Sequence, residues 1–223
     1  MKWTPVVSNN IDWISFVFIA ILAIIAFIKT YHSFRFREFL NLLFNNKYII
    51  IFNKKEKTNV LFTSSLLGIQ WLVLSITIWL LMRYFLIDFS FYSIPLPYII
   101  MVGVAAFLLL KITFQRFISY VFDFDLFSRS YLFIRLSYSN YASFILVFLL
   151  FFDIYGMNNN IYLLGFSLIT FLYIQILGLV SFVKLYKNEI RHYWYYFILY
   201  LCTVEIVPYI FIKHWIINSS SIS

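Results

Sequence analysis

Long apolar segments, separated by short charged ones, are the feature that most limits how this chain can fold. A helix needs about 20 residues to cross the roughly 30 Å hydrocarbon core of a bilayer, and six segments approach or exceed that length with few charges. Hydrophobic residues make up 63% of the chain and charged residues 12%. That is too little polar surface for a water-soluble globule, which usually has about 25% charged residues. The sequence therefore predicts an all-α polytopic membrane protein, with residues 1–223 forming a single integral membrane domain.

The predicted spans are the apolar segments that contain no more than two charged side chains each. They cover residues 13–28, 61–85, 94–114, 141–155, 161–183 and 193–217. The first lacks the basic leader and the small-residue cleavage site of a signal peptide, so we expect it to be retained. Two further segments, residues 29–47 and 115–137, mix apolar and charged positions. We expect both to be amphipathic helices in the membrane interface, the second broken near Asp123.

Lysine and arginine collect in the segments that follow the first, third and fifth predicted spans. These segments contain Lys29, Arg35, Arg37, Lys47, Lys54, Lys55, Lys57, Lys111, Arg116, Arg129, Arg135, Lys184, Lys187 and Arg191. The other side has Lys2, Arg83 and Lys213. Because basic residues mark cytoplasmic loops, we expect both termini to lie outside the cytoplasm and the cytoplasmic face to contact anionic lipids. A net charge of +8 could suggest binding to nucleic acid. Because no basic segment belongs to a nucleic-acid-binding module, we predict no nucleic-acid partner.

Glu205 is the acidic residue nearest the middle of a predicted span. An ionised side chain at the bilayer centre costs about 2.5–3.5 kcal/mol on insertion scales, so Glu205 should face the protein interior. Pro208, three residues later, removes one backbone hydrogen bond and predicts a kink. Two interpretations stay open: a proton-binding or partner-binding site, or a carboxylic acid packed between helices. The candidate partners are the side-chain amides of Gln70 and Gln175, since we expect Lys111 nearer the cytoplasmic end of its span.

Asp123 and Asp125 form an acidic pair beside Arg116 and Arg129, at the predicted cytoplasmic interface. Carboxylates so close in sequence can hold a divalent cation that binds a lipid-linked diphosphate. The competing interpretation is a solvated ion pair, because Asp125 precedes Arg129 by four residues, a favourable order in a helix. The three histidines lack metal-ligand spacing and the single cysteine, Cys202, has no partner, so we predict no metal site and no cofactor.

Three sequence blocks carry a resemblance to a known family. They are Asp12-Trp13, Phe44-Asn45-Asn46-Lys47-Tyr48 and Tyr200-Leu201-Cys202-Thr203-Val204-Glu205-Ile206-Val207-Pro208. Over nearly its whole length the chain resembles a Bacteroidota family of polytopic inner-membrane proteins that share a domain of unknown function. The resemblance implies a multi-pass inner-membrane protein of a Gram-negative cell, with Glu205 and Pro208 as part of the family's signature. It supplies no reaction.

Three functions follow from these observations. Small loops and the lack of catalytic motifs favour a non-enzymatic inner-membrane subunit or scaffold of an envelope-biogenesis or protein-export assembly. Its partners would be other inner-membrane proteins or copies of itself, and a link to the type 9 secretion or gliding apparatus rests on lineage alone. The alternative is a small proton-coupled transporter that uses Glu205. The third is an enzyme that acts on lipid-linked substrates through Asp123 and Asp125.

Overall fold

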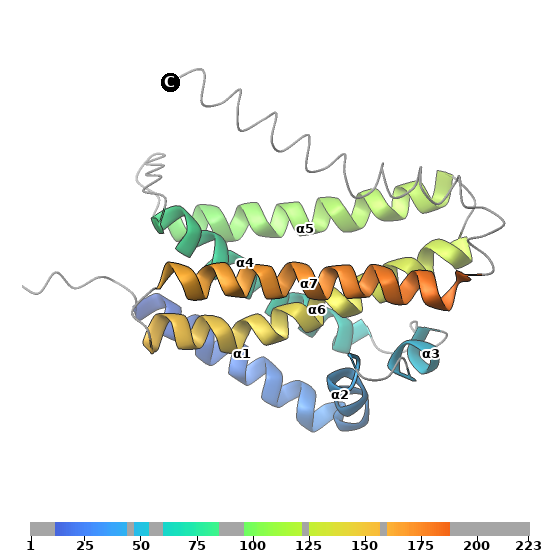
Figure 1. The fold of residues 1–223 in the computed structure, drawn as a ribbon, viewed down its shortest axis with the longest axis horizontal. Helices are drawn as coiled ribbons and strands as arrows, with labels where there is room; N and C mark the ends of the chain where they lie inside the picture. The colour runs from blue at the N-terminus through green and yellow to red at the C-terminus, as the bar shows by residue number, and fades with distance from the viewer. Residues whose placement is uncertain are drawn as a thin grey trace, which may run out of the picture.

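The computed structural model describes residues 12–43, 47–53, 60–84, 96–121, 125–156 and 160–187 (Figure 1). Within these ranges the chain forms seven helices and no strand. The helices are α1 (Asp12–Tyr31), α2 (Ser33–Leu40), α3 (Lys47–Asn53), α4 (Val60–Tyr84), α5 (Leu96–Val121), α6 (Asp125–Tyr155) and α7 (Ile161–Leu185). The all-α fold class is confirmed.

Five of these helices, α1, α4, α5, α6 and α7, are long and apolar enough to cross a membrane. Each overlaps one of the first five predicted spans, and consecutive ones reverse direction along a common long axis (Figure 1). The chain is therefore a multi-pass membrane protein. The sixth predicted span, residues 193–217, lies outside the described residues.

The two segments expected to be separate interfacial helices differ from the prediction. Residues 29–47 divide among the end of α1, the eight-residue helix α2 and the first residue of α3. Residues 115–137 form no element of their own, because α5 continues to Val121 and α6 already begins at Asp125. Charged side chains do not end a span helix at the hydrocarbon boundary, since long cationic side chains reach the headgroups from inside it. The expected break near Asp123 falls in residues 122–124, outside the described residues.

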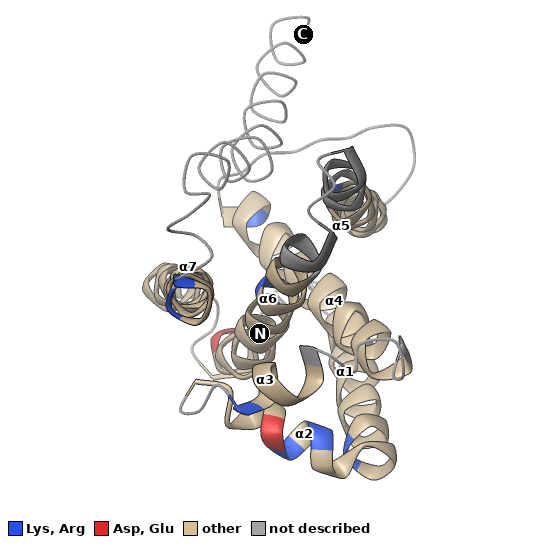
Figure 2. Cartoon of the chain, turned by 90° about the vertical axis from the view of Figure 1, so that its right-hand side faces the viewer, with Lys and Arg blue, Asp and Glu red and all other residues tan. Residues whose placement is uncertain are grey.

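The two ends of the bundle differ in charge. We call the end where α1, α5 and α7 finish and α4 and α6 begin the basic end. Figure 2 looks onto this end, with lysine and arginine on several of its helices. In the described ranges it has Lys29, Arg35, Arg37, Lys47, Arg116, Arg129, Lys184 and Lys187, whereas Arg83 lies near the opposite end.

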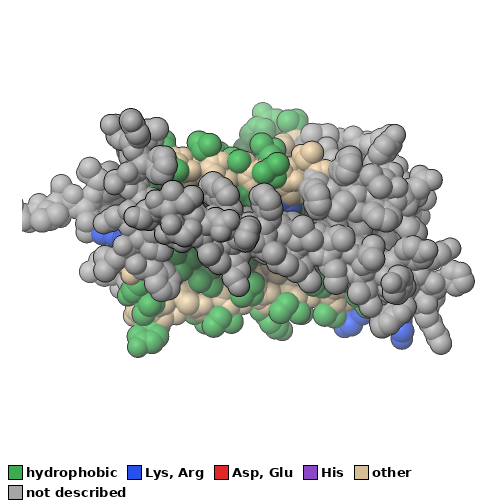
Figure 3. Space-filling view, turned by 90° about the horizontal axis from the view of Figure 1, so that it is seen from above, with side chains coloured by type: hydrophobic (Ala, Val, Ile, Leu, Met, Phe, Trp, Pro, Cys, Tyr) green, Lys and Arg blue, Asp and Glu red, His purple; other side chains and the backbone are tan. Residues whose placement is uncertain are grey.

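Helix α6 lies at the centre of the bundle, with α4, α5 and α7 around it (Figure 2). Inside the protein, 61% of the α6 span is buried, against 11% of the α5 span. Large apolar side chains such as Phe16, Val102, Tyr162 and Ile169 point outward, and hydrophobic side chains line the visible flanks in Figure 3. A hydrophobic exterior around a packed central helix suits lipid surroundings.

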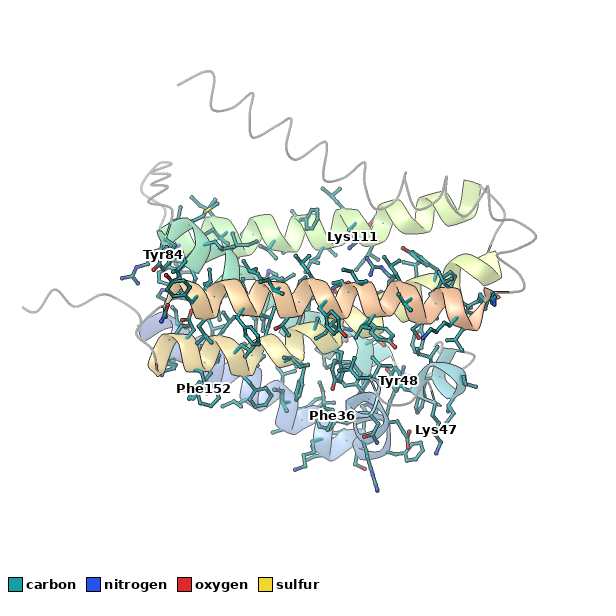
Figure 4. The ribbon with its side chains drawn as sticks, in the orientation of Figure 1. Phe36, Lys47, Tyr48, Tyr84, Lys111 and Phe152 are labelled. Carbon is teal, nitrogen blue, oxygen red and sulfur yellow. The ribbon has the colours of Figure 1, made fainter. Side chains whose placement is uncertain are left out.

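Helices α2 and α3 form a short layer at the basic end, which we call the α2–α3 layer (Figure 4 labels Phe36 and Tyr48 in it). Aromatic rings fix the layer to α6. The Tyr48 ring stacks on that of Phe133, with the centroids 5.9 Å apart, and the Phe39 ring lies 5.6 Å from that of Tyr141. Aromatic pairs of this kind stabilise beyond the apolar area that they bury.

Candidate functional site

A group of polar side chains from three helices lies inside the bundle, about midway between its two ends. It consists of Gln70 on α4, Arg135 and Ser139 on α6, and Gln175 on α7, and we call it the polar layer. Gln70 and Gln175 each lie ten residues from the basic-end terminus of their helices, which is about 15 Å of helix. Because that is about half of a bilayer core, the layer lies near the middle of the membrane-spanning region.

One serine hydroxyl joins three spans in the polar layer. Ser139 Oγ accepts hydrogen bonds from Gln70 Nε2 at 2.8 Å and from Gln175 Nε2 at 2.9 Å. Gln175 also uses the other end of its amide, because its Oε1 accepts from Arg135 Nη1 at 3.2 Å. The same nitrogen donates to the backbone carbonyl of Gln175 at 2.8 Å. A continuous chain of hydrogen bonds therefore links α4, α6 and α7.

These hydrogen bonds stabilise the contact between spans. In a membrane, an interhelical side-chain hydrogen bond contributes about 0.6 kcal/mol on average and up to about 1.7 kcal/mol. Gln70 is buried, so water cannot replace its partner. Arg135, a cation inside a span, donates to two oxygens of Gln175, which lowers the cost of placing it there. The described contacts of the layer thus hold helices together.

Two amide oxygens near the polar layer are buried and accept no hydrogen bond from the described residues: Gln70 Oε1 and Asn140 Oδ1. A buried carbonyl oxygen without a donor carries a desolvation penalty of about 1–3 kcal/mol. Such an oxygen could accept from the O–H of a protonated carboxyl group or from another donor that reaches it. The polar layer could therefore accept hydrogen bonds from a further donor group.

Lys111 lies at the depth of the polar layer. It stands fifteen residues from Leu96 in α5, and Gln70 stands fourteen from Tyr84 in α4, both counted from the opposite end of the bundle. Figure 4 places Lys111 well within the length of α5. The apolar span within α5 covers Leu96–Thr113 and ends two residues beyond Lys111, in agreement with the expectation that Lys111 lies near one end of its span, although the helix itself continues to Val121.

A close approach of α6 and α7 accompanies the polar layer. A Cβ atom on Gly178 would lie 2.9 Å from Cβ and 3.0 Å from Cγ of Tyr138, so the space for a side chain is already filled. Farther toward the basic end, the Tyr131 and Phe182 rings pack edge to face with centroids 5.0 Å apart. Small residues let spans approach closely, which brings polar groups of facing helices within hydrogen-bonding distance.

Asp153, near the opposite end of α6, is part of the connection to α7. It is 1% exposed, and its Oδ1 accepts a hydrogen bond from the backbone N–H of Asn160 at 2.9 Å. Asn160 in turn caps α7, because its side-chain oxygen accepts from the backbone N–H of Tyr162 at 3.1 Å. These contacts give Asp153 a structural role in the turn.

A family model of unknown function covers most of the chain. The domain of unknown function DUF4271 matches residues 14–216. The chain belongs to the DUF4271 family. The match includes the polar layer, all but the first residue of the five described spans, and all but the last residue of the predicted sixth span. No curated protein and no solved structure matches the chain.

Of the four residues predicted for an intramembrane site in this DUF4271 chain, the structure brings two together. Gln70 and Gln175 donate to the same oxygen, Ser139 Oγ. Glu205 and Pro208 lie outside the described residues.

Sequence reasoning did not select Arg135 or Ser139 for this site. Arg135 falls in the segment expected to be interfacial, and Ser139 falls between that segment and the predicted fourth span. One signal was available: Arg135, Ser139 and Ser143 recur every four residues, which places polar groups along one face of a helix.

The predicted cytoplasmic candidates are placed by the backbone alone. Arg116 lies in α5, Asp125 is the first residue of α6 and Arg129 follows one turn later. Their side chains, and all of Asp123, lie outside what the structure describes. Arg116, Asp125 and Arg129 therefore lie toward the basic end of the bundle, where α5 finishes and α6 begins.

Proposed function

We propose that this DUF4271 protein is a non-enzymatic subunit or scaffold of an inner-membrane assembly that serves envelope biogenesis or protein export. The observation that carries the proposal is the polar layer, in which the amides of Gln70 and Gln175 both bond Ser139. Polar groups used in this way hold spans in a fixed register. The α2–α3 layer and the basic end then offer surfaces to other inner-membrane proteins or to further copies of the chain.

The proposal includes an orientation. The basic end faces the cytoplasm of a Bacteroidota cell, and both termini are periplasmic. The gathering of exposed lysine and arginine at this end supports it, with Lys29, Arg37 and Lys184 able to meet anionic lipids. A sixth span over residues 193–217 would return the chain to the opposite end.

Glu205 belongs to the polar layer in this proposal. It stands twelve residues from each end of the predicted span 193–217, which is the middle of a membrane-crossing helix. A carboxyl group at that depth needs hydrogen-bond partners. The layer offers donors from Arg135 and acceptors such as Gln70 Oε1. We propose that Glu205 is a packing contact there and that Pro208 shapes its helix.

A second candidate, a small proton-coupled transporter, is favoured by one observation. Gln70 Oε1 and Asn140 Oδ1 are buried and accept no hydrogen bond within the described part of the chain. A carboxyl group beside them would have acceptors in its protonated form and the donors of Arg135 in its ionised form. Glu205 would then gain and lose a proton during transport.

Replacing Glu205 with glutamine distinguishes these two functions. Glutamine keeps the shape and hydrogen-bonding capacity of a carboxylic acid but cannot exchange a proton. If Glu205 is a packing contact, a strain carrying Glu205→Gln at the native locus should keep nearly normal protein abundance and envelope function. Abundance is measured by immunoblotting of membranes, and function by the growth and secretion defects of a deletion strain.

Glu205→Leu is the control, because it removes every hydrogen bond of the side chain. It should lower abundance, since the polar partners would lose their contact. Normal abundance of Glu205→Gln combined with the defects of the deletion strain would contradict the packing role and support proton transport.

A further inference from the structure

Arg35 of α2 is a buried cation between two aromatic rings. Arg35 is only 4% exposed. The guanidinium carbon lies 4.8 Å from the ring centroid of Phe52 on α3 and 4.7 Å from that of Phe62 on α4. Cation–π contacts of this length attract the charge. A cation–π contact supplies no hydrogen-bond acceptor for the N–H groups of the guanidinium.

The three guanidinium nitrogens are buried and have no hydrogen-bond partner among the described residues. Arginine remains charged at physiological pH, and a buried charge without a paired anion is strongly unfavourable. Glu38, one turn later in α2, has its carboxylate 3.9 Å from Lys47 Nζ. An anion that accepts hydrogen bonds from the guanidinium of Arg35 would therefore stabilise this buried charge.

The location of Arg35 indicates the source of that anion. It lies at the basic end, in the short helix that follows the first span, and the exposed side chains of Lys29 and Arg37 add positive charge. Phe34 and Ile50, on the outside of the α2–α3 layer, are 62% and 63% exposed. Exposed apolar side chains beside basic ones are typical of helices at the headgroup boundary.

The chemistry of the side chain indicates a phosphate. The planar fork of a guanidinium matches phosphate oxygens with two parallel hydrogen bonds. Basic pockets between spans on the cytoplasmic side bind anionic lipid head groups. We propose that Arg35, held by Phe52 and Phe62, binds the phosphate of an anionic phospholipid at the basic end.

Access requires a small movement of the α2–α3 layer, because the guanidinium is enclosed. Phe52 comes from α3, which has seven residues, and Phe62 from the first turn of α4. If α3 moved away, Phe52 would no longer cover the guanidinium, and a lipid headgroup could reach it from the membrane surface. Lipid binding would then hold this layer in a defined position at the membrane surface.

Lipid-dependent stability of the full chain tests the proposal. The protein is purified in a neutral detergent, and its midpoint of thermal unfolding is measured with added phosphatidylglycerol or with phosphatidylcholine of the same acyl chains. We expect phosphatidylglycerol to raise the midpoint and phosphatidylcholine not to, since a ligand stabilises the state that binds it. Arg35→Gln should weaken the apparent affinity for phosphatidylglycerol about 10- to 100-fold, the equivalent of losing a charged hydrogen bond.

The control is Arg83→Gln, which removes a cation near the opposite end of the bundle and should keep the rise in midpoint. If Arg35→Gln does not fold, Arg35→Lys retains the charge without the planar fork and should lose most of the rise. The proposal is overturned if Arg35→Gln or Arg35→Lys responds like the unchanged protein. It is also overturned if phosphatidylglycerol and phosphatidylcholine act alike, or if inorganic phosphate alone gives the same rise.

Discussion

Replacing Gly178 with leucine is expected to force α6 and α7 apart and to give the largest loss of stability of any substitution considered for this protein. A Cβ atom at position 178 would already lie 2.9 Å from Tyr138 Cβ. Tyr138 is buried, and the atoms that would clash are at the root of its side chain, so a rotation of the ring cannot relieve the contact. Overpacking a filled site costs about 1–3 kcal/mol and occasionally more, and we expect leucine at or above the upper end.

The measurement is the free energy of unfolding, or the midpoint of thermal unfolding, of the full chain in one detergent. Gly165, on the same helix, is the matched control because a Cβ atom there would meet nothing within 4 Å. Gly165→Leu should be close to neutral, and the better helix propensity of leucine contributes up to about 1 kcal/mol in its favour. Equal stability of the two variants would contradict the close α6–α7 contact.

Replacing Ser139 with alanine should give the second largest loss. The substitution removes the acceptor of both Gln70 Nε2 and Gln175 Nε2. Gln70 is only 5% exposed, so its amide N–H cannot bond water in place of Ser139. A buried donor left without a partner costs about 1–3 kcal/mol, and we expect a loss of this size in the same unfolding measurement.

Ser143 supplies the control for that substitution. It is 0% exposed, and its hydroxyl donates to the carbonyl of Ser139 in its own helix at 3.1 Å. Ser143→Ala should change stability by about 0.5 kcal/mol or less, because the backbone carbonyl keeps its helical hydrogen bond. A double-mutant cycle of Ser139→Ala with Gln70→Met should give a coupling energy of about 0.6–1.7 kcal/mol. A coupling energy of zero would contradict a stabilising hydrogen bond between Gln70 and Ser139.

The spans could be predicted because length and hydrophobicity alone decide them. The prediction of residues 161–183 corresponds to α7 at Ile161–Leu185, and that of residues 61–85 to α4 at Val60–Tyr84. The apolar span within α6 covers Ser130–Tyr155 and so begins earlier than the predicted fourth span, residues 141–155. Arg129 and Arg135 suggested a surface helix, but cationic side chains can remain in a helix that extends beyond the hydrocarbon core.

The polar layer could be predicted only in part. The sequence predicts Gln70 and Gln175 as partners of Glu205, because an amide in a span can donate a hydrogen bond to a neighbouring helix. Both amides bond the same serine because α4 and α7 each turn one face toward α6. The sequence pattern does not specify these helix rotations. Arg35 was recognised as a basic residue of an amphipathic segment, but its burial depends on Phe52 and Phe62, which come from two other helices.

If the protein is a subunit or scaffold of a larger assembly, the particle extracted from its native membrane should have a mass larger than that of one chain. The protein is tagged at its native locus and extracted in mild detergent, and the mass and composition of the purified particle are determined by mass spectrometry and size measurement. We expect a particle in which other inner-membrane proteins, or further copies of the chain, are present in fixed stoichiometry. A solitary particle of one 26.9 kDa chain would contradict it.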